Sequence, residues 1–179
     1  AAVERSGGVS RAGGSALEMT LVVWRHPRPQ AAAGRCIGRT DLLIDRRKAK
    51  RLAHRVRRAV RNEEIPRRVF TSPLQRCAAV GRALRRMGFV HVLDADLLEL
   101  DFGDWDGRLW THIAHADVAA WEADFMRHQP GGGESLEALL TRMRRFCERS
   151  PQGVVIGHAG WINAWCWLAR GSKEAPNAT

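Results

Sequence analysis

The sequence predicts a three-layer α/β/α fold with a mostly parallel central sheet, and three observations carry this prediction. Short apolar runs rich in strand formers alternate with longer segments in which apolar residues recur every three or four positions. Several of these runs are followed directly by polar residues. Ligands of open α/β sheets bind outside the carboxyl ends of the strands, where such residues lie. The 179 residues suit one domain with a single core.

The first strand is predicted over residues 19–24, an apolar run that stops at Arg25 and His26. Pro27 and Pro29 keep the following loop out of a helix. This segment therefore has the pattern of a buried strand that ends at a polar loop.

A helix is predicted over residues 45–64, because Leu52, Val56 and Val60 recur every four positions and form one apolar stripe. The rest of its surface is dense in arginine and lysine. We interpret that surface mainly as a solvated basic face, with contact to nucleic acid as the alternative.

The next segments are a strand over residues 68–71, a helix, and a strand over residues 89–93. Ser72 followed by Pro73 predicts the start of the helix, with serine as the N-cap and proline at the first helical position.

The last part of the chain repeats the alternation. A helix is predicted over residues 135–149, a strand over residues 153–157, and a further helix over residues 160–169. His158 follows the strand directly, so a third strand ends in a polar residue.

These strand ends should meet, because the carboxyl ends of parallel strands lie at the same edge of a sheet. The clusters that we expect there are Arg25-His26, Thr71-Ser72 with Arg76 one turn on, and Gly157-His158.

Phosphoryl transfer needs cations or N–H groups around the phosphoryl oxygens and a nucleophile in line with the leaving group. Arg25, Arg76 and the N-terminus of the helix over residues 72–86 would supply the first. A neutral imidazole at His26 would supply the second, and neighbouring arginines lower the pKa of a histidine.

The reaction also needs an acid for the leaving oxygen, and Glu99 lies in an apolar stretch that would raise its pKa. Asp101, two residues on, is the competing candidate. His158 would donate a hydrogen bond to a phosphoryl oxygen. Taken singly, each candidate has a plainer interpretation. Arg25-His26 would be a surface pair, His158 a structural histidine, and Glu99 a capping or surface acid.

Taken together, the motifs resemble the histidine phosphatase superfamily, the phosphoglycerate-mutase-like proteins. The segments that carry the resemblance stand in the family's order at residues 21–26, 34–42, 69–76, 98–107, 132–135 and 154–160. The first segment ends in the Arg-His motif, and the fourth segment holds the Phe-Gly-Asp-Trp-Asp-Gly turn.

The resemblance implies a role for each matching residue. His26 becomes the phosphorylated nucleophile and Glu99 the proton donor. The phosphate pocket then consists of Arg25, Arg76 and His158, and the substrate is lined by Ile37, Gly38 and the backbone at Ala159. The resemblance also implies that no metal and no cofactor are needed.

The chain departs from the family pattern after the Arg-His motif. Pro27 stands where the family usually has glycine, and an asparagine that contacts phosphate is missing, so Arg28 or Gln30 is expected to replace it. Pro27 after the Arg-His motif, combined with the Gly-x-Cys-x-Gly-x-x-Asp pattern at residues 34–41, resembles the α-ribazole phosphatase branch, which serves cobalamin synthesis. The alternatives are a phosphoglycerate mutase, a broad-specificity phosphatase and an inactive relative.

The resemblance places a lid at about residues 108–130, and its short length favours a small phosphatase over a mutase. Two small helices are expected there, with Trp110 and Trp121. These tryptophans would pack the lid onto the core or stack on an aromatic leaving group.

Composition limits the partners and the compartment. Lys and Arg number 29 against 19 Asp and Glu, so the formal net charge is +10 and favours an anionic partner. We expect a small phosphorylated metabolite and no membrane contact, with a homodimer as an open alternative. Four cysteines without Cys-x-x-Cys spacing indicate reduced thiols and no zinc site, as in a cytoplasmic protein.

The expected domain covers residues 19–170. Residues 1–18, rich in Gly, Ser and Ala, are expected to be a disordered tail and residues 171–179 a disordered or truncated end. Many members of the resembled family continue further, so we expect the sheet to lack a C-terminal edge strand.

Overall fold

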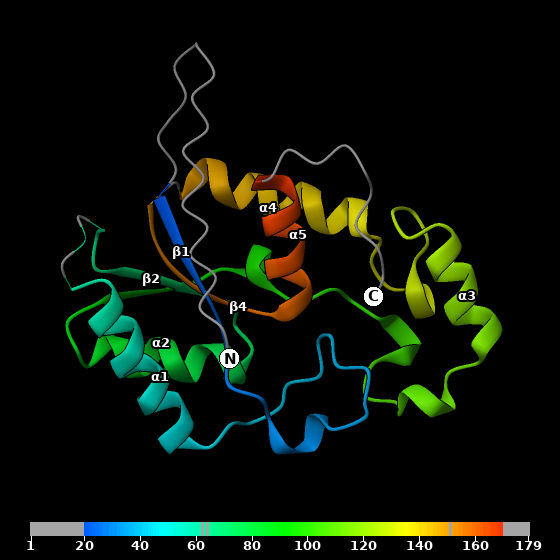
Figure 1. Ribbon diagram of the computed structural model, residues 1–179, viewed down its shortest axis with the longest axis horizontal. Coiled ribbons are helices and arrows are strands. Elements are labelled where there is room, and N and C mark those ends of the chain that lie inside the picture. Colours follow the sequence, from blue (N-terminus) through cyan, green and yellow to red (C-terminus); the bar gives the residue numbers. More distant parts are fainter. Residues whose placement is uncertain (1–19, 62, 64, 151, 170–179) are drawn as a thin grey trace, which may run out of the picture.

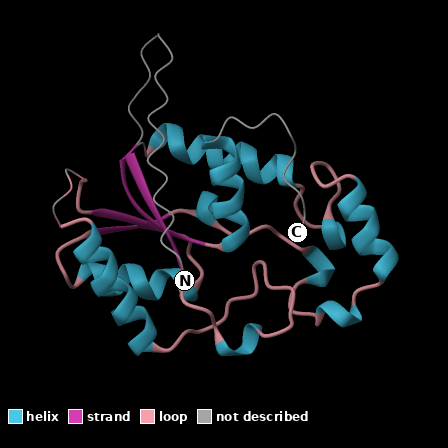
Figure 2. Cartoon of the chain, in the orientation of Figure 1, coloured by secondary structure: helices cyan, strands magenta, loops and turns pink. Residues whose placement is uncertain are grey.

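The structure, a computed structural model, describes residues 20–61, 63, 65–150 and 152–169. Its sheet has four parallel strands in the order β1-β4-β2-β3. The strands are β1 (Thr20–Arg25), β2 (Arg68–Thr71), β3 (Val90–Leu93) and β4 (Gln152–Gly157). Helices cover both faces of this sheet (Figures 1 and 2), so the predicted α/β/α fold is confirmed.

The helices fall close to their predicted positions. They are α1 (Arg46–Ala59), α2 (Gln75–Arg85), α3 (His115–Ala123), α4 (Leu136–Arg149) and α5 (Ala159–Ala169). Short 3-10 helices lie at Gln30–Ala32, Ala95–Leu97, Gly103–Trp105, Trp110–His112 and Pro130–Gly132.

The two faces of the sheet bury separate apolar clusters, because successive side chains of a strand point to opposite faces. In β4, Val154 and Ile156 pack against α1 and α2, whereas Val155 packs against α4 and α5. In β1, Trp24 belongs to the first cluster and Leu21 to the second. All five side chains are buried.

The register of the sheet brings distant residues to one edge. Arg25 pairs with Gly157, and Thr71 pairs with Ile156. The N–H of His26 then donates to the carbonyl of Gly157 at 3.1 Å, directly before His158. The ends of β1, β2 and β4 therefore lie side by side.

The predicted start of α2 is wrong. The helix begins at Gln75, and Ser72 does not cap it, because the Ser72 hydroxyl is hydrogen-bonded to His158 Nε2 at 2.8 Å. The carboxylate of Asp41 accepts from the N–H of Gln75 at 2.7 Å instead. The cap thus comes from the loop before α1.

The segment between β3 and α4 lies beyond the end of the sheet and carries α3 (Figure 1). Trp121 packs against Phe102, Trp105 and Phe125, with ring centroids 5.1 to 6.0 Å apart. Trp110 contacts the edge of Phe102 but stays 40% exposed. Aromatic packing therefore holds this segment onto the loop that follows Glu99.

None of the helices in the part of the chain that the structure describes is long and apolar enough to span a membrane. The expectations for residues 1–18 and 171–179, and for an edge strand after α5, lie outside the described residues.

Candidate active site

A pocket of about 1000 Å³ opens at the carboxyl edge of the sheet. Six of the eight residues to which the resemblance assigns a site role line it: Arg25, His26, Ile37, Arg76, Glu99 and Ala159. Gly38 and His158 are not part of the lining. Both contact Arg76, Gly38 through its carbonyl and His158 through its ring.

His26 is held in one tautomer. Its Nδ1 lies 2.8 Å from the carbonyl oxygen of Pro27, which can only accept, so Nδ1 carries the proton. The neutral ring then has its lone pair on Nε2. The pKa of His26 is lowered to about 4, mainly by burial and to a smaller extent by Arg76 and Arg25, while the Pro27 hydrogen bond opposes the shift. His26 is therefore neutral and nucleophilic at neutral pH.

Arg76 is 1% exposed, and its guanidinium is fixed on three sides. Nη1 donates to the carbonyl of Thr40 at 2.6 Å, Nη2 to that of Gly38 at 2.5 Å, and Nε to His158 Nδ1 at 3.2 Å. A guanidinium has five N–H groups, so each terminal nitrogen keeps one beyond these three bonds. Arg76 can therefore bind an oxyanion without giving up its supports.

His158 is fully buried, and its ring lies edge-on to His26 with the centroids 5.0 Å apart. Because Arg76 Nε can only donate, Nδ1 of His158 accepts, and Nε2 carries the proton toward Ser72 Oγ. Burial, Arg76 and His26 hold the pKa of His158 well below its ordinary value. In this arrangement His158 orients Arg76, whereas the sequence suggested that it donates directly to the phosphoryl group.

Asp106 supports Arg76 indirectly, by fixing the loop whose carbonyls accept from its guanidinium. The sequence did not reveal this role. Its carboxylate accepts from the N–H groups of Gly38, Arg39 and Thr40 at 2.6 to 3.0 Å, and from Thr40 Oγ1 at 2.8 Å. The carbonyls of the same loop receive Arg76. A Cβ on Gly38 would lie 2.3 Å from the carbonyl oxygen of Leu100, so this loop needs glycine there.

Glu99 joins the pocket to α5. Its carboxylate accepts from the N–H groups of Gly160 and Trp161 in the first turn of α5, at 3.0 and 3.1 Å, and from that of Leu100 at 3.1 Å. Burial raises the pKa of Glu99, and these three donors partly offset the rise. A Cβ on Gly160 would lie 2.6 Å from Oε1, so the close approach needs glycine. Glu99 therefore caps a helix and presents a carboxyl group to the pocket.

Asp101, the competing acid, faces another way. It pairs with Arg39 at 3.1 Å, accepts from the N–H of Gly103 at 2.9 Å, and is not part of the pocket lining. Its geometry gives no support to a role in proton transfer.

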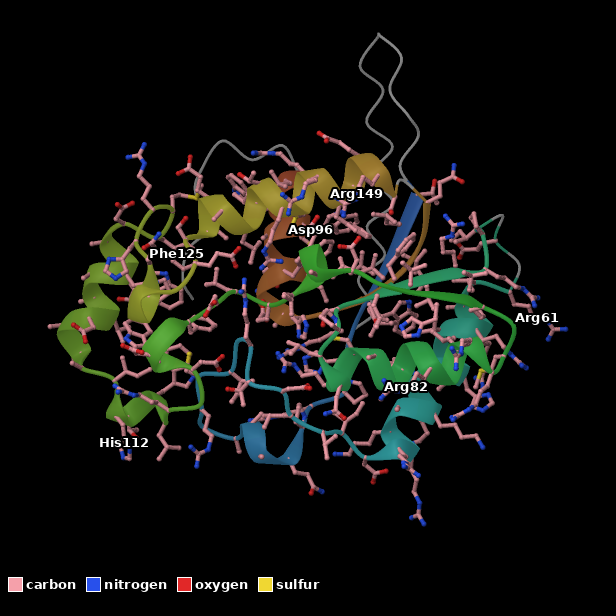
Figure 3. All side chains as sticks on the ribbon, turned by 180° about the vertical axis from the view of Figure 1, so that it is seen from behind. Arg61, Arg82, Asp96, His112, Phe125 and Arg149 are labelled. Atoms are coloured by element: carbon pink, nitrogen blue, oxygen red, sulfur yellow. The ribbon has the colours of Figure 1, made fainter. Side chains whose placement is uncertain are left out.

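Arg142, from α4, fixes the segment that carries Glu99. It donates to the carbonyls of Asp96 and Leu98 at 2.7 Å and of Glu99 at 3.2 Å. Glu134 pairs with the same guanidinium at 2.7 Å. Asp96 also pairs with Arg149 at 2.8 Å on the outer side of α4 (Figure 3).

The sequence placed the N-terminus of the helix after Ser72 in the phosphate site, and the structure contradicts this. The first N–H of α2 bonds to Asp41, and neither Leu74 nor Gln75 lines the pocket. The N-terminus of α5 does line it, through Ala159 and Gly160. Of the two candidates for the missing asparagine, Arg28 lines the pocket, whereas Gln30 does not.

Two groups of lining residues differ in chemistry. The first is the aromatic wall, which consists of Phe102, Trp110, Trp121 and Phe125. The second consists of basic side chains of α1 and of the loop after β1. Of the described residues that line the pocket, Glu99 alone is acidic, so the pocket suits an anion with an apolar part.

No group of three or more His, Cys, Asp and Glu side chains that could hold a metal ion occurs among the described residues. The cation-rich lining supplies positive charge from arginine and lysine instead.

The fold and the site define an α/β protein in which His26, Arg25 and Arg76 line an anion pocket and the buried His158 supports Arg76. The model of the histidine phosphatase superfamily (branch 1) matches residues 21–176. The chain therefore belongs to this superfamily of phosphate-monoester hydrolases, which confirms the family predicted from the sequence.

Solved structures support this assignment. A protein of Thermus thermophilus is 30% identical, with a TM-score of 0.62 over 80% of this chain and 81% of that one. A mycobacterial glucosyl-3-phosphoglycerate phosphatase has a TM-score of 0.69 at 24% identity, over 82% of this chain and 76% of its own. The latter comparison shows a common fold.

Among curated proteins, a bifunctional protein of Mycobacterium tuberculosis is 35% identical over 96 residues, 51% of this chain and 25% of that protein. The adenosylcobalamin/α-ribazole phosphatase of Salmonella typhimurium is 34% identical over 87 residues, 46% of this chain and 43% of its own. The chain thus matches a quarter of the first relative and under half of the second.

Proposed function

We propose that this chain is a phosphomonoesterase that works through a phosphohistidine on His26. The observation that carries the proposal is the fixed tautomer of His26, which leaves Nε2 free beside Arg25 and Arg76. A nucleophile needs an unprotonated lone pair, and the low pKa of His26 keeps it available at neutral pH.

In the first step, Nε2 of His26 attacks phosphorus and forms a P–N bond while the P–O bond to the alcohol breaks. Arg25 and Arg76 stabilise the phosphoryl oxygens. The proton of Glu99 passes to the leaving oxygen, so the alcohol departs neutral.

In the second step, water attacks the phosphohistidine. The Glu99 carboxylate takes a proton from this water, the P–N bond breaks, and inorganic phosphate and neutral His26 result. Burial raises the pKa of Glu99, so its carboxyl group holds a proton more readily than an ordinary glutamate does, before the first step and again after the second.

For the substrate, we propose a small phosphate ester with an aromatic part, such as α-ribazole 5′-phosphate. The aromatic wall, which includes the 40% exposed Trp110, would pack against such a group. The name of the Salmonella relative supports the same class. A mutase or a broad-specificity phosphatase is the alternative.

Phosphate release from α-ribazole 5′-phosphate, 3-phosphoglycerate and nucleoside 5′-monophosphates tests this proposal. The wild type should release phosphate fastest from the esters with an aromatic group, and His26→Ala should release none. Transfer of phosphate between positions of 3-phosphoglycerate, without net release, would indicate a mutase instead.

A further inference from the structure

A strip of basic side chains on α1 faces the pocket. Lys48, Arg51 and Arg55 stand three and four positions apart, so they share one side of the helix. All three line the pocket, together with Arg28 from the loop after β1. We call these four residues the basic arm.

The orientation of α1 explains why this strip faces inward. Leu52 and Val56 are buried against the sheet and fix the roll of the helix. Arg55 is held further by Trp24, whose ring centroid lies 5.8 Å from the guanidinium carbon. Trp24 directly precedes Arg25 in β1, so this contact holds Arg55 near the end of the strand, close to the start of the loop with His26.

No ion pair of a described acidic side chain reaches the basic arm. Among the described residues, the ion pairs of acidic side chains are made with Arg39, Arg142, Arg145 and Arg149, none of which belongs to the arm. Like charges at this spacing repel one another along a helix. A bound anion would relieve this repulsion. On the outer side of α1, the surrounding water screens the basic side chains from one another.

The pocket is also larger than the reacting group requires. Its volume of about 1000 Å³ matches that of sites for drug-sized ligands, roughly 300 to 1000 Å³. The transferred phosphoryl group would fill only the corner at His26, Arg25 and Arg76. The aromatic wall and the basic arm therefore remain for the rest of the substrate.

We propose that the basic arm binds a second phosphoryl group on the same substrate, so the preferred substrates are esters with two phosphoryl groups. This inference rests on the proposed function and narrows its substrate class. A dianion can be shared by several cations, and guanidinium groups bind phosphoryl oxygens through paired N–H groups. α-Ribazole 5′-phosphate carries one phosphoryl group and would leave the arm empty, so it should be hydrolysed less efficiently than an aromatic ester that carries two.

A matched pair of nucleotides tests this. Adenosine 3′,5′-bisphosphate and adenosine 5′-monophosphate share the base and the sugar and differ in one phosphoryl group. The wild type should show a kcat/KM roughly tenfold or more in favour of the bisphosphate, mainly through KM. The combined variant Lys48→Gln, Arg51→Gln, Arg55→Gln should bring this ratio close to one.

The control is a variant with the same loss of charge on the same helix. Arg47, Lys50 and Arg57 are exposed and do not line the pocket, so their combined replacement by glutamine should keep the ratio of the wild type. An equal fall of the ratio in this variant would overturn the proposal, because the general field of the helix would then be responsible. A wild-type ratio near one would overturn it too.

Binding provides a readout that does not depend on turnover. Calorimetry with His26→Ala should show the bisphosphate bound roughly tenfold more tightly than the monophosphate, and equal affinities would contradict the basic arm. Absence of phosphate release by the wild type, with this difference in affinity intact, would refute the proposed function and leave the arm supported.

Discussion

Lowering the pH should destabilise the folded protein through His26, and replacing this imidazole should remove that loss. Folding lowers the pKa of His26 from 6.5 to about 4, first through burial and then through Arg76 and Arg25. Well above pH 6.5, the imidazole of His26 is neutral in both the folded and the unfolded state. As the pH falls below this value, the unfolded chain takes up a proton that the folded chain still excludes, so unfolding becomes more favourable.

Linkage sets the size of this effect. With the pKa values of 6.5 and about 4, the free energy of unfolding should fall by about 2 kcal/mol between about pH 7 and about pH 5 through His26 alone. His26→Asn lacks this titration, and its amide N–H can replace Nδ1 as the donor to Pro27. The variant should therefore lose about 2 kcal/mol less than the wild type over the same interval.

Urea unfolding followed by tryptophan fluorescence at the two pH values measures these losses. His54→Asn is the control, because it removes an exposed histidine from α1, and it should follow the wild type. Parallel losses in the wild type and His26→Asn would refute the reasoning, since His26 would then titrate alike in the folded and unfolded states.

Three further outcomes are expected. Glu99→Gln should slow hydrolysis of a ribose 5-phosphate ester by about 10²- to 10⁴-fold and that of p-nitrophenyl phosphate far less, because p-nitrophenolate leaves without a proton; a selective loss in Asp101→Asn instead would assign the acid to Asp101. Asp106→Asn should lower kcat/KM and weaken inhibition by inorganic phosphate by about tenfold each, because an amide cannot accept all the N–H groups that hold the Arg76 loop. The exposed neighbour Asp104→Asn should change neither, and an equal effect there would exclude a specific role of Asp106. Hydrolysis should continue in EDTA, and activity that EDTA abolishes and a divalent ion restores would contradict the absence of a metal requirement.

The strand ends were predictable from local sequence, because each is a short apolar run followed by a polar residue. Parallel pairing then brings His26 and His158 together, as the register of β1 and β4 shows. The class of fold and the meeting of these residues follow from alternation and chain connectivity alone.

Contacts between distant loops were not predictable in the same way. Ser72 has the local preference of an N-cap, but its hydroxyl bonds to buried His158, and Asp41 caps α2 instead. Asp106 supports Arg76 across a loop contact that no local pattern marks. The basic face of α1 was visible in the sequence, but which of its residues reach the pocket depends on how the buried stripe fixes the roll of the helix.

Trapping the phosphoenzyme tests the central claim most directly. Rapid mixing of the wild type with ³²P-labelled substrate and quenching in alkali should leave label on the peptide that contains His26. This label should be stable in alkali and lost in acid, as expected for a phosphohistidine, and His26→Ala should carry none. Phosphate release by the wild type without such a label, or a label that persists in His26→Ala, would contradict transfer through this histidine.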